Sequence, residues 1–169
     1  MDDLGALIAP QIPRLRRYAR ALTGERGRAD DLVQDTLERA LGRFHLWRRG
    51  SDLRAWLFTI MHNLFVNQVR TADPLADGAD LDTVTVAARG GPADVTDLLD
   101  LDAALRRLPD EHREVLLLVG LEQLSHQEAA AVLGVPLGTV MSRLSRARER
   151  LRRLMAGEPA PSVSLRVVK

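Results

Sequence analysis

The sequence predicts an all-α protein of two small helical domains joined by a flexible acidic linker, with a helix-turn-helix in the C-terminal domain. Three observations support this fold class. Apolar residues recur every three or four positions over most of the chain. Hydrophobic residues make up 46% of the 169 residues and aromatic residues only 4%. A central stretch interrupts the helical pattern with aspartates, alanines and the breaker Gly90-Gly91-Pro92.

Changes in composition set the expected boundaries. They give a helical domain over 1–70, a linker over 71–96, a second helical domain over 97–156 and a frayed tail over 157–169. Between residues 71 and 97 the charged residues are six aspartates and one arginine, whereas residues 136–155 carry six arginines and one glutamate. Although the net charge of the whole chain is only +1, the chain contains an acidic region and a basic region. This separation of charge indicates that the two regions have different functions.

Three helices are expected in the first domain. The first runs from Ile12 to about Leu22 and ends at Thr23-Gly24, and the second runs from Ala29 to about Phe44. The third runs from about Leu53 to Arg70, with Ser51 or Asp52 as its N-cap. Each has a wide apolar face, and we assign Trp56 to the core.

The second predicted helix carries an acidic stripe opposite its core face. Asp31, Gln34, Asp35 and Glu38 stand at i, i+3, i+4 and i+7 and so share one exposed surface. Such a stripe, taken alone, is more often a solvated face than a functional one.

The third predicted helix carries a polar stripe. Thr59, Asn63, Asn67 and Arg70 line one side, and His62 lies beside them. Amides can bond base edges and a guanidinium can meet phosphate, so the stripe is compatible with nucleic acid. Surface asparagines that a helix merely tolerates would give the same pattern.

The clearest motif is a helix-turn-helix over 124–154. Ser125 and Glu128 form a capping box, Gly134 supplies the turn, and the second helix begins near Pro136 or Leu137. That helix alternates an apolar face with a stripe of arginines. The exposed candidates for a DNA major groove are Thr139, Ser142, Arg143 and Arg146. An amphipathic helix that is simply solvated by its arginines is the alternative.

Other classes of protein fit poorly. The chain has no cysteine, its start lacks the pattern of a secretion signal, and its longest apolar run, Val115 to Leu121, is too short to span a bilayer. A cytoplasmic protein without membrane insertion is expected. The four histidines are scattered, and neither a His-Glu-x-x-His motif nor a phosphate-binding glycine loop occurs. We therefore expect no enzymatic activity, no metal and no cofactor.

Four segments together resemble a bacterial RNA polymerase sigma factor of the extracytoplasmic-function (ECF) type. They are Asp30-Asp-Leu-Val-Gln-Asp-Thr-Leu-Glu-Arg-Ala40, Leu53-Arg-Ala-Trp-Leu-Phe-Thr-Ile-Met-His-Asn63, Leu105-Arg-Arg-Leu-Pro-Asp-Glu-His-Arg-Glu-Val-Leu116 and Gly138-Thr-Val-Met-Ser-Arg-Leu-Ser-Arg-Ala-Arg148. They occur in the family's order and the resemblance covers the chain from Ile12 to Leu154. The second segment also resembles the alphaproteobacterial general-stress branch of the family.

The resemblance implies partners and roles for matching residues. The partners are core RNA polymerase, promoter DNA and an anti-sigma factor, and the role is promoter recruitment and strand opening in transcription initiation. The implied polymerase-binding residues are Asp31, Leu32, Gln34, Asp35 and Glu38. The implied minus-ten DNA-binding residues are Arg48, Arg49, Thr59, His62, Asn63, Asn67 and Arg70, with a flipped base at Asn63. The implied minus-thirty-five DNA-binding residues are Thr139, Met141, Ser142, Arg143 and Arg146.

Two positions depart from the family pattern. Met141 stands where many relatives carry Lys or Arg, and Asn67 stands where relatives often carry Asp. The promoter sequence therefore cannot be copied from other members. A two-domain helix-turn-helix regulator that acts without polymerase is the alternative function, because its C-terminal motif would look the same.

Overall fold

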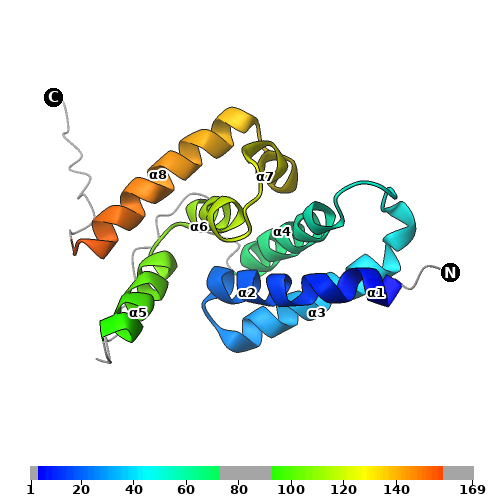
Figure 1. The fold of residues 1–169 in the computed structure, drawn as a ribbon, viewed down its shortest axis with the longest axis horizontal. Helices are drawn as coiled ribbons and strands as arrows, with labels where there is room; N and C mark the ends of the chain where they lie inside the picture. Colours follow the sequence, from blue (N-terminus) through cyan, green and yellow to red (C-terminus); the bar gives the residue numbers. More distant parts are fainter. Residues whose placement is uncertain (1–3, 73–92, 158–169) are drawn as a thin grey trace.

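The computed structural model describes residues 4–72 and 93–157, and every element within those ranges is helical (Figure 1). The first module comprises α1 (Leu4–Ile8), η1 (Ala9–Gln11), α2 (Ile12–Thr23), α3 (Arg26–Gly42), η2 (Phe44–Leu46) and α4 (Leu53–Ala72). The second module comprises α5 (Ala93–Arg106), α6 (Asp110–Leu116), the π-helical turn η3 (Leu117–Leu121), α7 (His126–Leu133) and α8 (Leu137–Met155). The predicted all-α fold with a C-terminal helix-turn-helix is confirmed.

Several predicted boundaries shift. The second predicted helix begins at Arg26 rather than Ala29, and Phe44 belongs to a separate 3-10 turn. Helix α4 continues to Ala72 and α5 starts at Ala93, so the linker predicted over 71–96 was drawn too wide at both ends. The rest of that linker call, 73–92, lies outside the described residues, as does the tail call for 158–169.

Local sequence signals explain the helix ends in the first module. Gly24 ends α2 in the left-handed conformation, with φ of 70°, which a residue with a Cβ adopts at a cost. Asp52 caps α4, because its Oδ1 accepts hydrogen bonds from the backbone N–H groups of Arg54 and Ala55 at 2.9 and 3.3 Å. Trp56 was assigned to the core. It packs against the core, as predicted, but its side chain is only half-buried.

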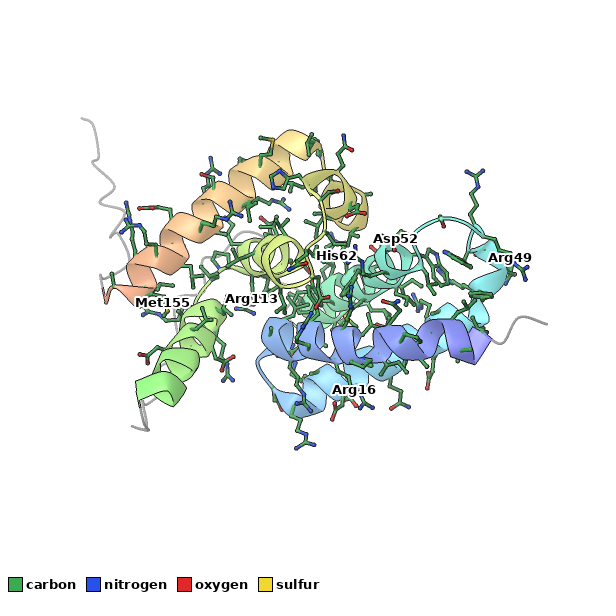
Figure 2. All side chains as sticks on the ribbon, viewed as in Figure 1. Arg16, Arg49, Asp52, His62, Arg113 and Met155 are labelled. Carbon is green, nitrogen blue, oxygen red and sulfur yellow. The ribbon has the colours of Figure 1, made fainter. Side chains whose placement is uncertain are left out.

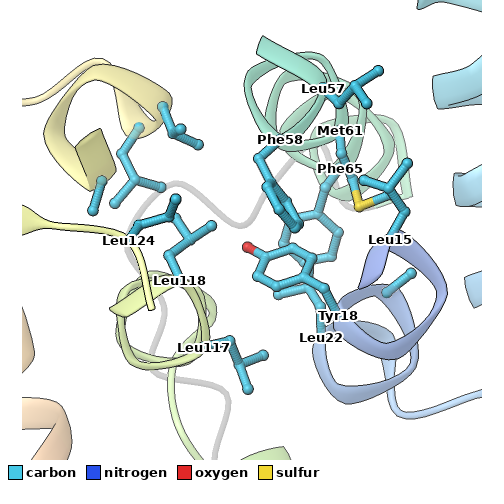
Figure 3. Packing of buried hydrophobic residues seen from close by; sticks show 14 of the residues in the cluster. Leu15, Tyr18, Leu22, Leu57, Phe58, Met61, Phe65, Leu117, Leu118 and Leu124 are labelled. Carbon is cyan, nitrogen blue, oxygen red and sulfur yellow. The ribbon is translucent and has the colours of Figure 1, made fainter. Parts of the chain in front are cut away.

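One apolar core runs through both modules (Figure 3). Tyr18 and Phe58 of the first module pack edge to face with ring centroids 5.0 Å apart. Leu118 and Leu124 of the second module belong to the same buried cluster and face these rings. Helix α4 also packs against α7. The two modules therefore form a single packed body, and the helix-turn-helix is seated on the first module.

Polar contacts reinforce this packing between the modules. The carboxylate of Glu122, with 0% of its side chain exposed, accepts a hydrogen bond from Arg17 Nη2 at 3.0 Å. The carbonyl of the same residue accepts from Arg54 Nη1 at 3.2 Å. Glu122 Oε2 has no hydrogen-bond partner among the described residues. A buried carboxylate loses hydration, so Arg17 is needed to offset the cost of burying it.

A buried arginine ties the second module together and links it to the first (Figure 2). The Arg113 guanidinium donates hydrogen bonds of 2.8 to 2.9 Å to the carbonyls of four residues. Three of them, Leu105, Arg106 and Leu108, lie at the C-terminal end of α5 or just beyond it, and the fourth, Leu22, lies in α2. The guanidinium thus satisfies carbonyls that the end of α5 leaves without helical partners.

Candidate partner and nucleic-acid surfaces

The acidic stripe of α3 is exposed. Asp31, Gln34, Asp35 and Glu38 all lie on its solvent side. Two polar contacts order the stripe: Gln34 Nε2 donates to Glu38 Oε1 at 3.2 Å, and Gln68 Nε2 of α4 donates to Asp35 Oδ2 at 3.4 Å. The four side chains therefore present carboxylates and an amide on one accessible face, as the spacing predicted.

Leu32 does not share this face. Its exposed fraction is 0%, because a residue one position after Asp31 is rotated by about 100° around the helix, which here turns it into the core. Leu32 therefore cannot touch a partner directly in this arrangement and acts through core packing. Its role is to hold α3 against the core.

The amide-lined face of α4 is partly confirmed. Asn63, Asn67 and Arg70 are exposed on one side of the helix. Thr59 is half-buried, and its hydroxyl donates to the carbonyl of Ala55 at 2.8 Å. Three of the four residues thus remain accessible, and they lie in the C-terminal half of α4.

His62 does not join that accessible face. Its Nδ1 lies 2.9 Å from Oε2 of Glu114 in α6, and the two side chains are 14% and 5% exposed. Burial raises the pKa of Glu114, and the contact with His62 opposes that increase. In this arrangement His62 is a contact between the modules, and it would reach nucleic acid only after the modules separate.

Arg48 and Arg49 are exposed in the loop before α4. Figure 2 shows Arg49 in the segment between η2 and α4, on the side of Asp52 away from the rest of the helix. Arg70 is in the last turn, and a 20-residue helix is about 30 Å long. The arginine pair and Arg70 therefore lie at opposite ends of α4 and cannot meet one phosphate.

The helix-turn-helix has the geometry that its sequence predicted. Ser125 Oγ accepts from the backbone N–H of Glu128 at 3.1 Å, and the Glu128 carboxylate accepts from the Ser125 N–H at 2.7 Å. Gly134 ends α7 with φ of 66°, and α8 begins at Leu137 after an extended Pro136. Val140, Leu144 and Ala147 of α8 are buried against the rest of the second module.

The outer face of α8 offers most of the predicted candidates. Met141 is 53% exposed, and Ser142 and Arg146 are exposed as well. Ser142 Oγ donates to the carbonyl of Thr139, which is half-buried. These residues form a surface with one cation, a hydroxyl and an apolar side chain, the residue types that contact phosphates, base edges and thymine methyl groups.

Arg143 is less available than its neighbours. Its side chain is 24% exposed, and Nη2 lies 3.6 Å from Oε2 of Glu111 in α6. The prediction that Arg143 is a freely exposed member of the arginine stripe was wrong. A half-buried arginine beside a carboxylate must leave that partner before it can reach DNA.

The buried polar residues between the modules were missed by the sequence analysis. Arg17 and Glu122 are 105 residues apart, and Arg113 and Leu22 are 91 apart. No periodicity within a helix signals such long-range pairs. Arg113 and Glu114 end the polar run Asp110-Glu-His-Arg-Glu114, so their sequence neighbours give no sign that they are buried.

Two family models match most of the chain. Residues 8–62 match the model described as "Sigma2 domain of PhyR", and residues 98–151 match "Sigma-70, region 4". The matched ranges correspond to the first and second modules. They place the acidic stripe and the first part of α4 in a sigma2 domain, and the helix-turn-helix in a region 4 domain.

Relatives and solved structures agree over nearly the whole chain. An ECF RNA polymerase sigma factor, EcfG, from Rhodopseudomonas palustris is 41% identical over 91% of this chain and 86% of its own length. The sigma factor RpoE of Bartonella quintana, solved in complex with the anti-sigma factor NepR, has a TM-score of 0.76 and 36% identity over 94% of this chain and 100% of that chain.

A third comparison covers a more distant relative. The structure of CnrH in complex with the cytosolic domain of CnrY has a TM-score of 0.66 at 29% identity, over 92% of this chain and 88% of that chain. The matches to EcfG and to the PhyR sigma2 model support the resemblance to the general-stress branch. Among the described residues, no helix is long and apolar enough to cross a membrane. The chain belongs to the ECF family of RNA polymerase sigma factors.

Proposed function

We propose that this chain recruits bacterial core RNA polymerase to specific promoters and promotes DNA melting there. The proposal depends on three exposed features: the acidic stripe, the amide-lined face and the helix-turn-helix. They occur in a chain that is similar to a sigma factor over 91% of its length. Polymerase supplies the chemistry of RNA synthesis, and this chain supplies promoter selection.

The acidic stripe is the proposed polymerase-binding surface. Asp31, Gln34, Asp35 and Glu38 carry three negative charges on one face, which suits a basic partner surface and speeds docking by charge complementarity. Leu32 supports this surface from inside.

Promoter DNA is proposed to contact two separate faces. Asn63 receives a flipped base of the minus-ten element, with Asn67 and Arg70 at nearby sugar or phosphate, because amides can bond the exposed edges of an unpaired base. On α8, Ser142 and Arg146 contact the minus-thirty-five element, and Met141 offers an apolar contact to a thymine methyl.

Promoter binding requires the two modules to separate. The two elements are named for positions about 25 base pairs apart, which at about 3.4 Å per step is roughly 80 Å of duplex. Helix α4 packs directly against α7, which is too close to serve both elements at once. Opening breaks the Glu122 contacts to Arg17 and Arg54, and it frees His62 from Glu114. Polymerase then tethers both modules, so neither needs high affinity for DNA by itself.

An anti-sigma factor is the third proposed partner. The Bartonella quintana relative was solved with an anti-sigma factor. The packed arrangement of the modules gives such an inhibitor a single body to bind.

Run-off transcription tests the proposal. Purified chain and bacterial core polymerase are incubated with promoters selected from a random library. Transcripts should appear only when both proteins are present, and the selected promoters should share two elements. DNA binding without any stimulation of transcription would instead indicate a regulator that acts without polymerase.

Charge reversal tests the polymerase surface. Asp31→Arg combined with Asp35→Arg should weaken binding to core polymerase at least tenfold while circular dichroism stays unchanged, because both residues are exposed. The matched control is Glu25→Arg with Asp100→Arg, two exposed acidic residues that lie off the stripe. Equal binding by both double variants would remove the stripe from the polymerase interface.

A further inference from the structure

Two arginines of the first module reach acidic residues of the second. Arg17 Nη2 of α2 lies 3.0 Å from Oε1 of Glu122, just after the π-helical turn η3. Arg54 Nη2 of α4 lies 4.0 Å from Oε2 of Glu128 in α7, and its Nη1 donates to the carbonyl of Glu122 at 3.2 Å. The histidine–carboxylate contact from α4 to α6 is oriented in the same way. In these contacts the first module supplies the basic groups and the second module supplies the carboxylates.

The elements that face each other divide in charge in the same way. Helix α2 holds four arginines and α4 holds two, and neither helix holds an acidic residue. Residues 110–133 of the second module, which include α6, η3 and α7, hold five acidic residues and one arginine. These three elements pack against α2 and α4 and lie between them and α8 (Figure 1). The second module therefore turns an acidic surface toward a basic one, although its own helix α8 is rich in arginine.

Separation of the modules removes these acidic partners from both arginines, and this step rests on the function proposed above. Helix α2 has no carboxylate that could replace Glu122 at Arg17. Arg54 keeps Asp52 of its own module, with Oδ2 3.7 Å from Nη2, but partly exposed pairs of this kind contribute little. Both guanidinium groups then become available to another anion. Phosphate is a close substitute for carboxylate, because an arginine donates paired hydrogen bonds to either group.

The position of Arg54 favours promoter DNA as that anion. Arg54 lies in the first turn of α4, after the loop with Arg48 and Arg49, and in the helix that carries Asn63. Asn63 is nine positions later, on the opposite side of the helix and roughly 17 Å away across its surface. A strand that reaches both residues therefore crosses α4 and spans about three to five nucleotides between them. An acidic surface of polymerase is a poorer match, because the proposed polymerase-binding stripe of this chain is itself acidic.

We propose that Arg17 and Arg54 bind neighbouring phosphates of the promoter strand once the modules separate. Their guanidinium groups converge on Glu122 in the packed form, so they lie close enough together to contact one stretch of backbone. In the packed form, Glu122 and Glu128 occupy the places that phosphates take in the promoter complex. The acidic segment of the second module thus competes with DNA for the first module. Removal of either arginine should weaken promoter binding, whereas removal of either carboxylate should not.

Promoter binding by the full chain with core polymerase tests the proposal. The probe is a fluorescein-labelled duplex that carries the promoter selected in run-off transcription. Arg17→Gln and Arg54→Gln should each weaken binding at least about threefold, because each loses a phosphate contact. Glu122→Gln and Glu128→Gln should bind at least as tightly as wild type, and glutamine can also serve in a capping box. If the ion pairs only hold the modules together, neither arginine variant loses affinity, and that result would overturn the proposal.

A matched control separates these contacts from general electrostatics. Arg107→Gln makes the same change in charge at an exposed residue that takes part in none of these contacts. Its promoter affinity should stay within about twofold of wild type. An equal loss in Arg107→Gln, or weaker binding by a carboxylate variant, would contradict the proposal. Thermal melts of all the variants establish that each is folded.

A scan with uncharged linkages shows whether the contact is direct. One methylphosphonate at a time replaces a phosphate of the nontemplate strand, which removes the charge at that linkage. Wild type should lose affinity at a linkage about three to five nucleotides from the base assigned to Asn63, and Arg54→Gln should be insensitive to the same replacement. Identical scans for wild type and Arg54→Gln would overturn the proposal.

Binding to core polymerase without DNA distinguishes the two classes of partner. It should stay near wild type in both arginine variants, and a loss there would assign the arginines to polymerase instead of DNA. Failure of the sigma-factor proposal would appear in wild type as a lack of promoter-directed transcription. Failure of the proposal for Arg17 and Arg54 would appear only in the variants, with wild type active.

Discussion

Helices α4 and α8 both carry residues proposed to contact the promoter. In each helix, one of these residues is paired with a carboxylate of α6 instead of being free to contact DNA. His62 of α4 pairs with Glu114, and Arg143 of α8 lies beside Glu111. The two helices otherwise differ. Helix α4 buries five residues in the core shared by both modules, whereas α8 buries three and has an arginine-rich exterior. Thus α4 lies in the centre of the structure and exposes a narrow strip of its surface. Helix α8 lies at the periphery and exposes a broad face.

The largest expected effect lies on the buried side of α4. Phe58→Ala removes a ring that is 1% exposed and stacks edge to face on Tyr18, so it should lower the free energy of unfolding by about 3–5 kcal/mol. Asn63→Ala, on the exposed edge of the same helix, should change it by no more than about 0.5 kcal/mol. Urea denaturation of both variants measures the difference. Similar small losses would show that α4 is not central to the fold.

The exposed edge of α4 should matter for melting rather than for folding. If Asn63 holds a flipped base, Asn63→Ala should retain polymerase binding and closed-complex formation but reduce permanganate-detected melting, since losing one base contact costs about 1–3 kcal/mol. Arg107→Ala is a control at an exposed residue that lies on none of the proposed surfaces. Normal melting by Asn63→Ala at limiting protein concentration would contradict the role.

Periodicity and capping signals predicted what each helix does by itself. The acidic stripe, the capping box at Ser125 and the turn at Gly134 all depend on residues within about two helical turns of each other, and the structure confirms them. The same signals could not show which residues face a second helix. His62 and Glu114 are 52 residues apart, and nothing in either helix indicates that the other will cover it.

The same reason explains why the full burial of Leu32 and the core between the modules were not predicted. Sequence similarity assigns roles to positions, but the exposed fraction of a side chain depends on its three-dimensional neighbours. The sequence predicted two domains joined by an acidic linker but did not predict how the domains lie relative to one another. In the structure their apolar faces pack together, with Leu118 and Leu124 against the aromatic residues of the first module.

The arginines of α8 should have separable effects on minus-thirty-five DNA. Arg146 is exposed, so Arg146→Ala should weaken binding to all sequences alike and lower the salt slope by about one, as loss of one phosphate contact does. Arg143→Ala should relax preference at one base position. Glu111→Gln releases Arg143 from a half-exposed ion pair worth about 0.2–1 kcal/mol and should tighten binding by up to about fivefold.

Duplexes chosen by selection on the full chain give the affinities for this comparison. Combining Glu111→Gln with Arg143→Ala should abolish the gain, because the released guanidinium is then missing. Unchanged affinity, selectivity and salt slope in both arginine variants would show that the arginine stripe is only a solvated face.

The smallest expected effect is a pH dependence of stability that arises from His112, on the side of α6 that faces α8. Burial lowers the pKa of His112 below 6.5, and Arg150, Arg146 and Arg143 lower it further, whereas Glu111 opposes them. Glu114, on the α4 side, has a raised pKa because it is buried. A histidine whose pKa is lower in the folded state binds fewer protons there than in the unfolded chain. Its contribution to stability is therefore complete above about pH 6.5 and declines as the pH falls toward the lowered value.

The contribution of His112 to the free energy of unfolding should accordingly fall on acidification, and it is obtained by comparing wild type with His112→Gln in urea at about pH 7.5 and about pH 5.8. His112→Gln cannot gain a proton, so the fall should be smaller in that variant, while the exposed His45→Gln should keep the wild-type pH dependence. The raised pKa of Glu114 acts in the opposite direction, because protonating that carboxyl relieves the cost of its burial. Identical pH dependence in wild type and His112→Gln would mean that α8's arginines do not influence α6 through His112.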